Sequence, residues 1–169
     1  MVLGYTGRTM PRTDSNTTNR AEARIADALS ERLGTYIKGA EQALMAEKAR
    51  VLKPLGLTVP QYAALHALSI GPLSGAQLAR ACSVTPQSIT SMLATLEGKE
   101  LIVRTQSDLH AQVLVTELTA SGRKMFARAD SAARAVERDL SATFDQDEER
   151  MLRALLQRAI DSLKGRAAT

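Results

Sequence analysis

Apolar side chains recur every three or four positions over residues 20–56, which predicts a long helical segment. The stripe consists of Ile25, Leu29, Leu33, Ile37, Ala40, Leu44, Val51 and Leu55. Gly34 and Gly39 are weak helix formers, so we expect a bend or a break at one of them. Gly56 supplies a left-handed residue at which the segment can end.

Three later helix starts are marked by capping sequences. A capping box fits Thr58-Val-Pro-Gln61, Ser74-Gly-Ala-Gln77 and Asp145-Gln-Asp-Glu148, since the first side chain can accept from a backbone N–H while the Gln or Glu three residues later reaches back. Thr85-Pro86 marks a further start, because the N–H that Pro lacks is not needed in a first helical turn. Gly71-Pro72 closes the helix that opens near residue 58.

The spacing changes from helical to strand-like after residue 100. Two runs rich in β-branched residues, Leu101–Val103 and Val113–Leu118, are separated by the polar segment Arg104–Gln112. This pattern predicts one β-hairpin. Helical spacing returns after Thr119, and a second start at Asp145 opens the last helix. The predicted order is therefore four helices, a hairpin and two helices.

Composition agrees with a helical protein that has no membrane-spanning segment. Apolar residues make up 44% of the 169 residues, aromatic residues only 3%, and Trp is absent, which favours a core of aliphatic helices. No apolar run reaches the roughly 18 residues of a membrane span. Residues 1–19 lack both apolar periodicity and the hydrophobic centre of a secretory signal, so we expect a flexible arm on a cytoplasmic protein.

Neither a metal site nor an enzymatic centre is indicated. Cys82 is the single cysteine, which excludes an internal disulfide and a multi-cysteine metal site. His66 and His110 have no partners at ligand spacing. The sequence holds no phosphate-binding glycine loop, no HExxH and no GxSxG. We therefore expect no cofactor, no metal and no catalytic activity.

Residues 74–98 carry the pattern that points to function. Two short predicted helices meet across Ser83-Val84, and apolar residues occupy the positions where such a pair must pack, with the small Ala79 where the helices come closest. The outward positions of the second helix hold short hydrogen-bonding side chains, namely Gln87, Ser88, Thr90, Ser91 and Thr95. With the hairpin directly after it as a wing, this is the pattern of a winged helix-turn-helix; the alternative is a plain helical hairpin with a polar solvent face.

Five segments in chain order strengthen this interpretation: Leu57–Leu68, Leu73–Ala79, Thr85–Glu97, Leu101–Arg104 and Leu118–Gly122. Together they resemble the MarR (multiple antibiotic resistance regulator) family over roughly residues 30–165. The first is similar to that family's "LT-x-x-Q-(Y/F)-x-x-L-x-x-L" helix and the second to its next helix. The third and fourth resemble its recognition helix and first wing strand, and the fifth matches the turn at which the wing returns to helix.

The resemblance implies an all-α fold with a small β-hairpin wing. Residues 57–119 would form the winged helix-turn-helix, while residues 20–56 and 120–165 would pair two subunits into a homodimer. Such a dimer would bind a double-stranded DNA operator as a repressor, with the recognition helix in the major groove and the wing over the minor groove. A small phenolic or aromatic ligand would release it, and its candidate contacts here are Tyr36, Tyr62 and His66.

The chain departs from the family pattern in the charged residues of this module. The family usually has Arg at the position of Ser91, an Asp at that of Ala94, and Asp-Arg-Arg where this chain reads His110-Ala111-Gln112. Both ends of the expected helix-to-wing ion pair are missing together, which suggests a wing held in a different way. Glu100 also stands where the family often has Gly.

These changes leave the predicted DNA-binding segment with only a weak positive charge. Residues 74–106 hold three cations, Arg80, Lys99 and Arg104, against Glu97 and Glu100, a net charge of +1. Lys and Arg contacts to phosphates normally supply most non-specific affinity, so helix N-termini and hydroxyl groups would have to contribute here. The predicted contacts to bases are Gln87, Ser88, Thr90 and Ser91, and the predicted contacts to phosphates are Ser74, Thr85, Thr95 and Arg104. The mildly basic arm, residues 1–19, would assist.

Alternatives remain at three points. The weak charge also fits a winged helix that serves as a protein-interaction scaffold without binding DNA. His66 is either a ligand contact or an ordinary, partly buried histidine packed under the helices. Cys82 is either a redox sensor or, as we favour, a small buried apolar residue.

Overall fold

The computed structural model describes residue 28, residues 31–106 and residues 114–167. The chain divides into two compact units, residues 1–43 and residues 44–169. Tyr36 belongs to the first unit, and the elements that form the helix-turn-helix and the wing belong to the second.

The first long helix runs through both glycines that the sequence marked as weak points. Helix α2 spans Leu33–Leu52 without interruption, so the predicted break at Gly34 or Gly39 is wrong, and the chain leaves the helical conformation at residues 31–32 instead. A 3₁₀ turn, η1 (Lys53–Leu55), follows α2 and ends at Gly56, whose φ of +66° is the left-handed conformation expected from its sequence. Ile25 and Leu29 of the apolar stripe lie outside the described residues.

The capping sequences begin helices where they were predicted to. Helix α3 (Val59–Ile70) and helix α4 (Gly75–Ala81) each start with a reciprocal capping box, formed by Thr58 with Gln61 and by Ser74 with Gln77. Helix α5 (Pro86–Gly98) has Thr85 at its N-cap and Pro at its first position. These local bonds satisfy backbone N–H groups that a helix leaves open, so the short α4 and α5 begin at defined residues.

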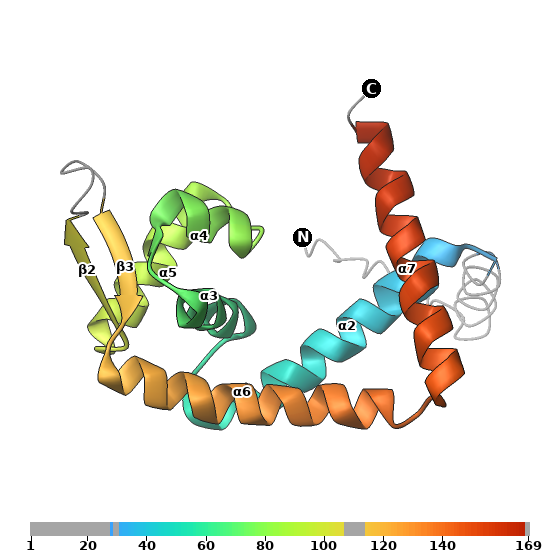
Figure 1. The fold of residues 1–169 in the computed structure, drawn as a ribbon, viewed down its shortest axis with the longest axis horizontal. Helices are drawn as coiled ribbons and strands as arrows, with labels where there is room; N and C mark the ends of the chain where they lie inside the picture. Colours follow the sequence, from blue (N-terminus) through green and yellow to red (C-terminus); the bar gives the residue numbers. More distant parts are fainter. Residues whose placement is uncertain (1–27, 29–30, 107–113, 168–169) are drawn as a thin grey trace, which may run out of the picture. The chain divides into compact units, whose positions relative to one another are not determined.

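The sheet has three strands rather than the two predicted. Strand β2 (Ile102–Gln106) and strand β3 (Leu114–Leu118) form the expected antiparallel hairpin (Figure 1). In its register Ile102 faces Leu118. Strand β1 (Leu73–Ser74) pairs with the other edge of β3, giving the order β1-β3-β2. Two residues are too few to show an alternating pattern, so β1 is visible only in the fold.

The core lies where α3, α4, α5 and the sheet meet. Its largest fully buried side chains are one leucine from each of α2, α3, α4 and α5, together with Thr116 of β3: Leu52, Leu65, Leu78, Leu96 and Thr116. Helix α6 (Ala120–Ser141) follows β3 and packs on α3 (Figure 1). Its Ala129 is fully buried in the core. An ion pair between Lys48 and Glu137 joins the end of α2 to α6.

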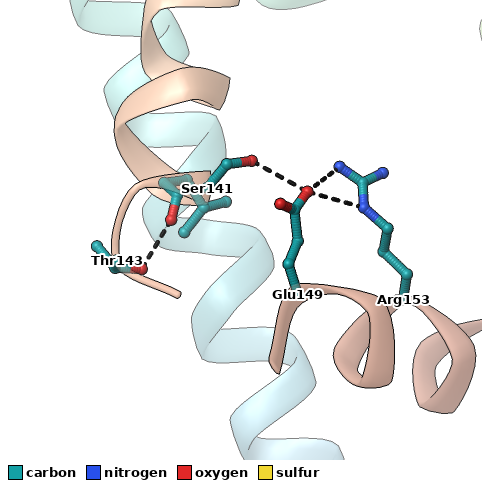
Figure 2. Close-up of polar contacts among 5 residues, drawn as sticks. Ser141, Thr143, Glu149 and Arg153 are labelled. Carbon is teal, nitrogen blue, oxygen red and sulfur yellow. Dashed lines mark hydrogen bonds and ion pairs between the residues drawn. The ribbon is translucent and has the colours of Figure 1, made fainter. Parts of the chain in front are cut away.

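A polar cluster holds the corner between α6 and the last helix, α7 (Gln146–Ala167). Figure 2 shows Ser141 and Arg153 both directed at Glu149: Ser141 Oγ donates to Glu149 Oε1 over 3.3 Å, and Arg153 Nε donates to the same oxygen over 2.9 Å. Asp145 caps α7 by accepting from the backbone N–H of Glu148 at 2.9 Å, as the sequence predicted. The corner is thus built from side chains close together in sequence.

Helix α7 buries no large apolar side chain against the described part of its own subunit. Its apolar row is exposed and consists of Met151, Leu152, Leu155, Leu156, Ile160 and Leu163. An uncovered apolar row of this length on one helix indicates a surface that another chain covers.

Candidate nucleic-acid interface

The turn between α4 and α5 sets the angle of the two helices. Ser83 takes a left-handed conformation, with φ of 54°, and the next N–H, of Val84, donates to the carbonyl of Ala79 over 3.0 Å. Ala79 is only 6% exposed, and its small side chain allows α5 to come close to α4. The α4–turn–α5 unit therefore has the geometry of a helix-turn-helix.

Helix α5 divides cleanly into a buried face and an exposed face. Ile89, Leu93 and Leu96 are buried in the core. The opposite face borders a shallow groove of about 540 Å³, the α5 groove, which is lined by Thr58, Thr85, Gln87, Ser88, Ser91, Met92 and Thr95. No described residue of the chain covers this groove, so the polar side of α5 is open to a large partner.

Most hydroxyl groups on this face are bonded locally. Thr85 Oγ1 accepts from the N–H of Ser88 at 3.1 Å and lies 2.8 Å from Ser88 Oγ. Thr95 Oγ1 donates to the carbonyl of Ser91 over 3.0 Å. These oxygens keep lone pairs free and can accept from a base donor without moving. Donation to a phosphate would require Thr95 to leave the Ser91 carbonyl, whereas one of the Thr85 and Ser88 hydroxyls keeps its proton for an outside acceptor.

Two polar side chains on this face, those of Gln87 and Ser91, are not bonded locally. Within residues 31–106 and 114–167, neither side chain makes a hydrogen bond, and both are exposed. Gln87 offers two donors and one acceptor, the set that reads an adenine edge in the major groove. Of the predicted base contacts, these two are the most readily available.

Thr90 lies on a different side of α5 from the other predicted contacts. It lines a pocket of about 580 Å³ between α4, α5 and the wing strands, together with Arg80 and Arg104. Its Oγ1 donates to the carbonyl of Pro86 over 2.9 Å. Thr90 is exposed, but it does not share the α5 groove with Gln87 and Ser91.

Arg104 is not a free cation, although the sequence marked it as a phosphate contact. Its Nε donates to Glu97 Oε2 over 3.1 Å, and its Nη2 forms an ion pair with the same oxygen. These hydrogen bonds hold the pKa of the Glu97 carboxyl below its usual range and raise the pKa of Arg104 further. An ion pair between α5 and the wing is therefore present, at positions other than Ala94 and the wing tip, and residues 110–112 lie outside the described part.

The other cations and the α4 cap are also partly engaged. Lys99 Nζ donates to the carbonyl of Gly56 over 2.7 Å. Ser74 Oγ lies 2.9 Å from Gln77 Oε1 and accepts from the N–H of Gln77, which leaves it little capacity for a phosphate. Among the described cations of residues 74–106, Arg80 is the one with neither a hydrogen bond nor an ion pair. Its place on α4 could have been recognised from sequence, because it follows the buried Leu78 and Ala79 on the outward side of that helix.

The predicted ligand contacts are only partly brought together. Tyr62 stacks on Phe126 of α6, with 6.4 Å between ring centroids, and His66 lies 5.8 Å from the same ring. His66 is exposed, so the expectation of a partly buried histidine under the helices is wrong. Phe126 was missed because only packing of α3 on α6 brings it to these rings. Tyr36 lies in the other unit of the chain.

The phenol of Tyr62 is engaged within the subunit. Its OH donates to Asp130 Oδ1 over 2.9 Å, and Asp130 is paired in turn with Arg134. Partial burial, followed by this hydrogen bond, raises the pKa of Tyr62 to about 12. Tyr62 can therefore stack on an aromatic ligand or accept a hydrogen bond from one, while donation to the ligand would require its bond to Asp130 to break or to be shared.

Cys82 lies at the C-cap of α4, half-buried beside the core. Burial raises the pKa of its thiol, which lowers the thiolate fraction available for oxidation. Across the described residues, no three His, Cys, Asp or Glu side chains come close enough to hold a metal ion. No helix in that same part of the chain has the length and apolar character of a membrane span.

Comparison with known proteins identifies the family. A sequence model described as the MarR family matches residues 55–112. The HTH-type transcriptional repressor Rv2887 of Mycobacterium tuberculosis is 35% identical over 127 residues, which cover 75% of this chain and 91% of that protein. The chain belongs to the MarR family.

Solved structures of MarR-family proteins share its fold. The transcriptional repressor CouR, bound to a 23-mer DNA duplex, matches with a TM-score of 0.72 and 28% identity over 78% of this chain and 94% of that one. Rv2887 of Mycobacterium tuberculosis in complex with p-aminosalicylic acid matches with a TM-score of 0.62 and 34% identity over 76% and 98%. The winged helix-turn-helix architecture predicted from the sequence is confirmed.

Proposed function

We propose that this MarR-family protein is a sequence-specific DNA-binding transcriptional repressor that acts as a homodimer in the cytoplasm, where the operator lies, and without catalytic turnover. The observation that carries the proposal is the polar face of α5, which is exposed along the α5 groove while the apolar face of the same helix is buried. CouR, which shares the fold, is a repressor solved on a DNA duplex.

Each part of the module has a role in this proposal. Residues 57–119 form the DNA-binding domain, with α5 in the major groove and the β2–β3 wing over the adjacent minor groove. Gln87 and Ser91 contact base edges, with Ser88 and Thr90 beside them. The contacts proposed for phosphates are Thr85, Thr95 and Arg104, and Ser74 once its hydroxyl turns away from Gln77. To these we add Arg80, which is unpaired among the described residues.

The dimer would be formed by residues 20–56 and 120–165. Helix α7 supplies the strongest support, because its exposed apolar row needs a cover that the described residues of one subunit do not provide. Two copies of α5 related by a two-fold axis would enter successive major grooves about one helical turn apart and so block access of polymerase. The arm, residues 1–19, would add phosphate contacts.

A small aromatic ligand would release the operator. Rv2887 has been solved with p-aminosalicylic acid, and the rings of Tyr62 and His66 with Phe126 form an aromatic cluster here that could stack on such a ligand, with Tyr36 as a further candidate. A ligand that binds one spacing of the two DNA-binding domains more tightly than the other shifts the population toward that spacing.

The test begins with selection of bound fragments from random duplex DNA by the purified protein. A double replacement, Gln87→Ala with Ser88→Ala, should weaken binding to the selected operator by about 1–3 kcal/mol per lost base contact and leave binding to unrelated DNA nearly unchanged. Gln157→Ala, an exposed glutamine on α7, is the matched control. Equal losses on operator and unrelated DNA would contradict base reading by α5.

A protein-interaction scaffold is the second candidate. It is favoured by one observation, namely that Arg104 and Lys99 are already engaged within the module and leave Arg80 as its free described cation. Gel retardation across a salt series separates the two functions, because phosphate contacts weaken steeply as salt rises. An absence of binding at every salt concentration would favour the scaffold.

A further inference from the structure

We infer that Glu97 is a positioning residue for the DNA-binding module: it holds Arg104 so that the wing keeps a fixed orientation relative to the recognition helix. This inference rests on the proposed function. By charge alone, the Glu97 carboxylate would be expected to weaken DNA binding, since a negative charge beside DNA repels phosphates.

The pair joins two elements at a defined place. Glu97 lies in the last turn of α5, and Arg104 lies in the middle of β2, opposite Thr116 of β3. Thr116 is only 1% exposed, so Arg104 lies opposite a buried residue of the sheet. The two side chains retain 39% and 30% exposure, respectively, which partly shields their ion pair from solvent.

One other hydrogen bond follows the end of α5, where the N–H of Leu101 donates to the carbonyl of Leu96. At the base of the wing, the N–H of Thr119 donates to the carbonyl of Leu101. Beyond these bonds, Glu97 with Arg104 is the side-chain hydrogen bond that ties β2 to α5 among the described residues. The base of the hairpin is also held by β1 and by the buried Ile102 and Leu118, so this link acts chiefly on β2 at Arg104 and beyond.

The geometry also leaves Arg104 able to contact DNA. Its Nε and Nη2 both point at one oxygen, Glu97 Oε2, while Nη1 has no partner among the described residues. An Arg side chain carries five N–H donors in a rigid fork, so one edge can remain on Glu97 while another binds a phosphate. Glu97 thereby orients the donor and reduces the side-chain entropy lost on binding.

The test compares two acidic residues three positions apart. Glu97→Gln removes one negative charge and the ion pair, whereas Glu100→Gln removes one negative charge from an exposed side chain without an ion pair to the described cations. We expect Glu97→Gln to weaken operator binding about fivefold, and Glu100→Gln to leave it unchanged or strengthen it. Glu97→Asp keeps the charge but shortens the reach, and should weaken binding in the same direction as Glu97→Gln.

Coupling and wing order provide the decisive measurements. The double variant, Glu97→Gln with Arg104→Gln, should bind the operator as weakly as Arg104→Gln alone, because the two residues act as one unit. In the free protein, amide exchange of β2 and β3 should speed up in Glu97→Gln and remain unchanged in Glu100→Gln. Chemical unfolding of each variant confirms that the subunit remains folded.

Several results would overturn the inference. These are equal effects of Glu97→Gln and Glu100→Gln on DNA binding, additive losses in the double variant, and unchanged amide exchange in the wing. If the wild-type protein binds no duplex at any salt concentration, the proposed function fails instead, and the exchange measurement still decides whether Glu97 positions the wing.

Discussion

Gly122 packs directly against the backbone of Leu101, so that a Cβ added at residue 122 would lie 1.8 Å from the Leu101 carbonyl oxygen. The contact lies where β3 ends and α6 begins, and Thr119 caps α6 there by accepting from the N–H of Gly122. The same threonine donates to the carbonyl of Glu100 over 2.7 Å. Close backbone approach at residue 122 thus joins the start of α6 to the base of the wing.

Gly122→Ala should therefore destabilise the protein by about 2 kcal/mol or more, because the new methyl group meets backbone that cannot rotate away. Chemical unfolding measures the loss. Gly98→Ala is the control, since a Cβ at Gly98 meets no atom within 4 Å and alanine favours the helix. Equal stability of the two variants would show that the Leu101 backbone moves aside.

Tyr62→Phe should cost about 1 kcal/mol of stability near neutral pH, because Asp130 loses a hydrogen-bond donor. The pKa of Tyr62 is raised from 10 to about 12 in the folded protein, so its contribution is fully present below pH 10 and is lost as the pH rises toward 12. Titration followed by tyrosinate absorption should show one phenol of the wild type that ionises near pH 12. That step should be absent from Tyr62→Phe. A Tyr36→Phe variant should keep that late step.

Leu156→Glu should separate the proposed dimer, because a charge would be placed in the apolar row of α7 where two subunits meet. Sedimentation should show a monomer, and operator affinity should fall at least tenfold, since both half-sites must be engaged at once. Gln157→Glu adds the same charge to the neighbouring, polar position of α7 and should remain dimeric. A dimeric Leu156→Glu would place the subunit interface elsewhere.

Cys82 should react slowly with a thiol-alkylating reagent in the folded protein and at an ordinary rate after unfolding, because burial raises the pKa of its thiol. Cys82→Ser should leave DNA binding as sensitive to peroxide as it is in the wild type. Loss of peroxide sensitivity in that variant would instead identify Cys82 as a redox sensor.

His66→Ala should weaken binding of a phenolic acid, because His66 is exposed beside the rings of Tyr62 and Phe126. Calorimetry with a panel of phenolic acids measures the change, and loss of one stacking partner should cost about 1 kcal/mol. Ser69→Ala, an exposed residue one turn further along α3, is the control. Identical binding by His66→Ala and the wild type would remove His66 from the ligand site.

The sequence by itself determined the helix starts, the buried and exposed faces of α5, and the resemblance to the MarR family. Capping boxes at Thr58 and Ser74 depend on residues three positions apart, so they can be recognised without the fold. The two faces of α5 follow from helical periodicity for the same reason. Interactions of this short range are encoded locally.

Tertiary structure decided the features that join residues distant in sequence or that depend on one of several possible partners. Strand β1 exists only because Leu73 and Ser74 meet β3, more than forty positions later. Phe126 reaches Tyr62 and His66 through the packing of α3 on α6, and Arg104 is held by Glu97, a partner that the local sequence pattern does not indicate. Periodicity shows which way a side chain points, whereas its partner is selected by the folded chain, because many polar partners are equally compatible with the same local pattern.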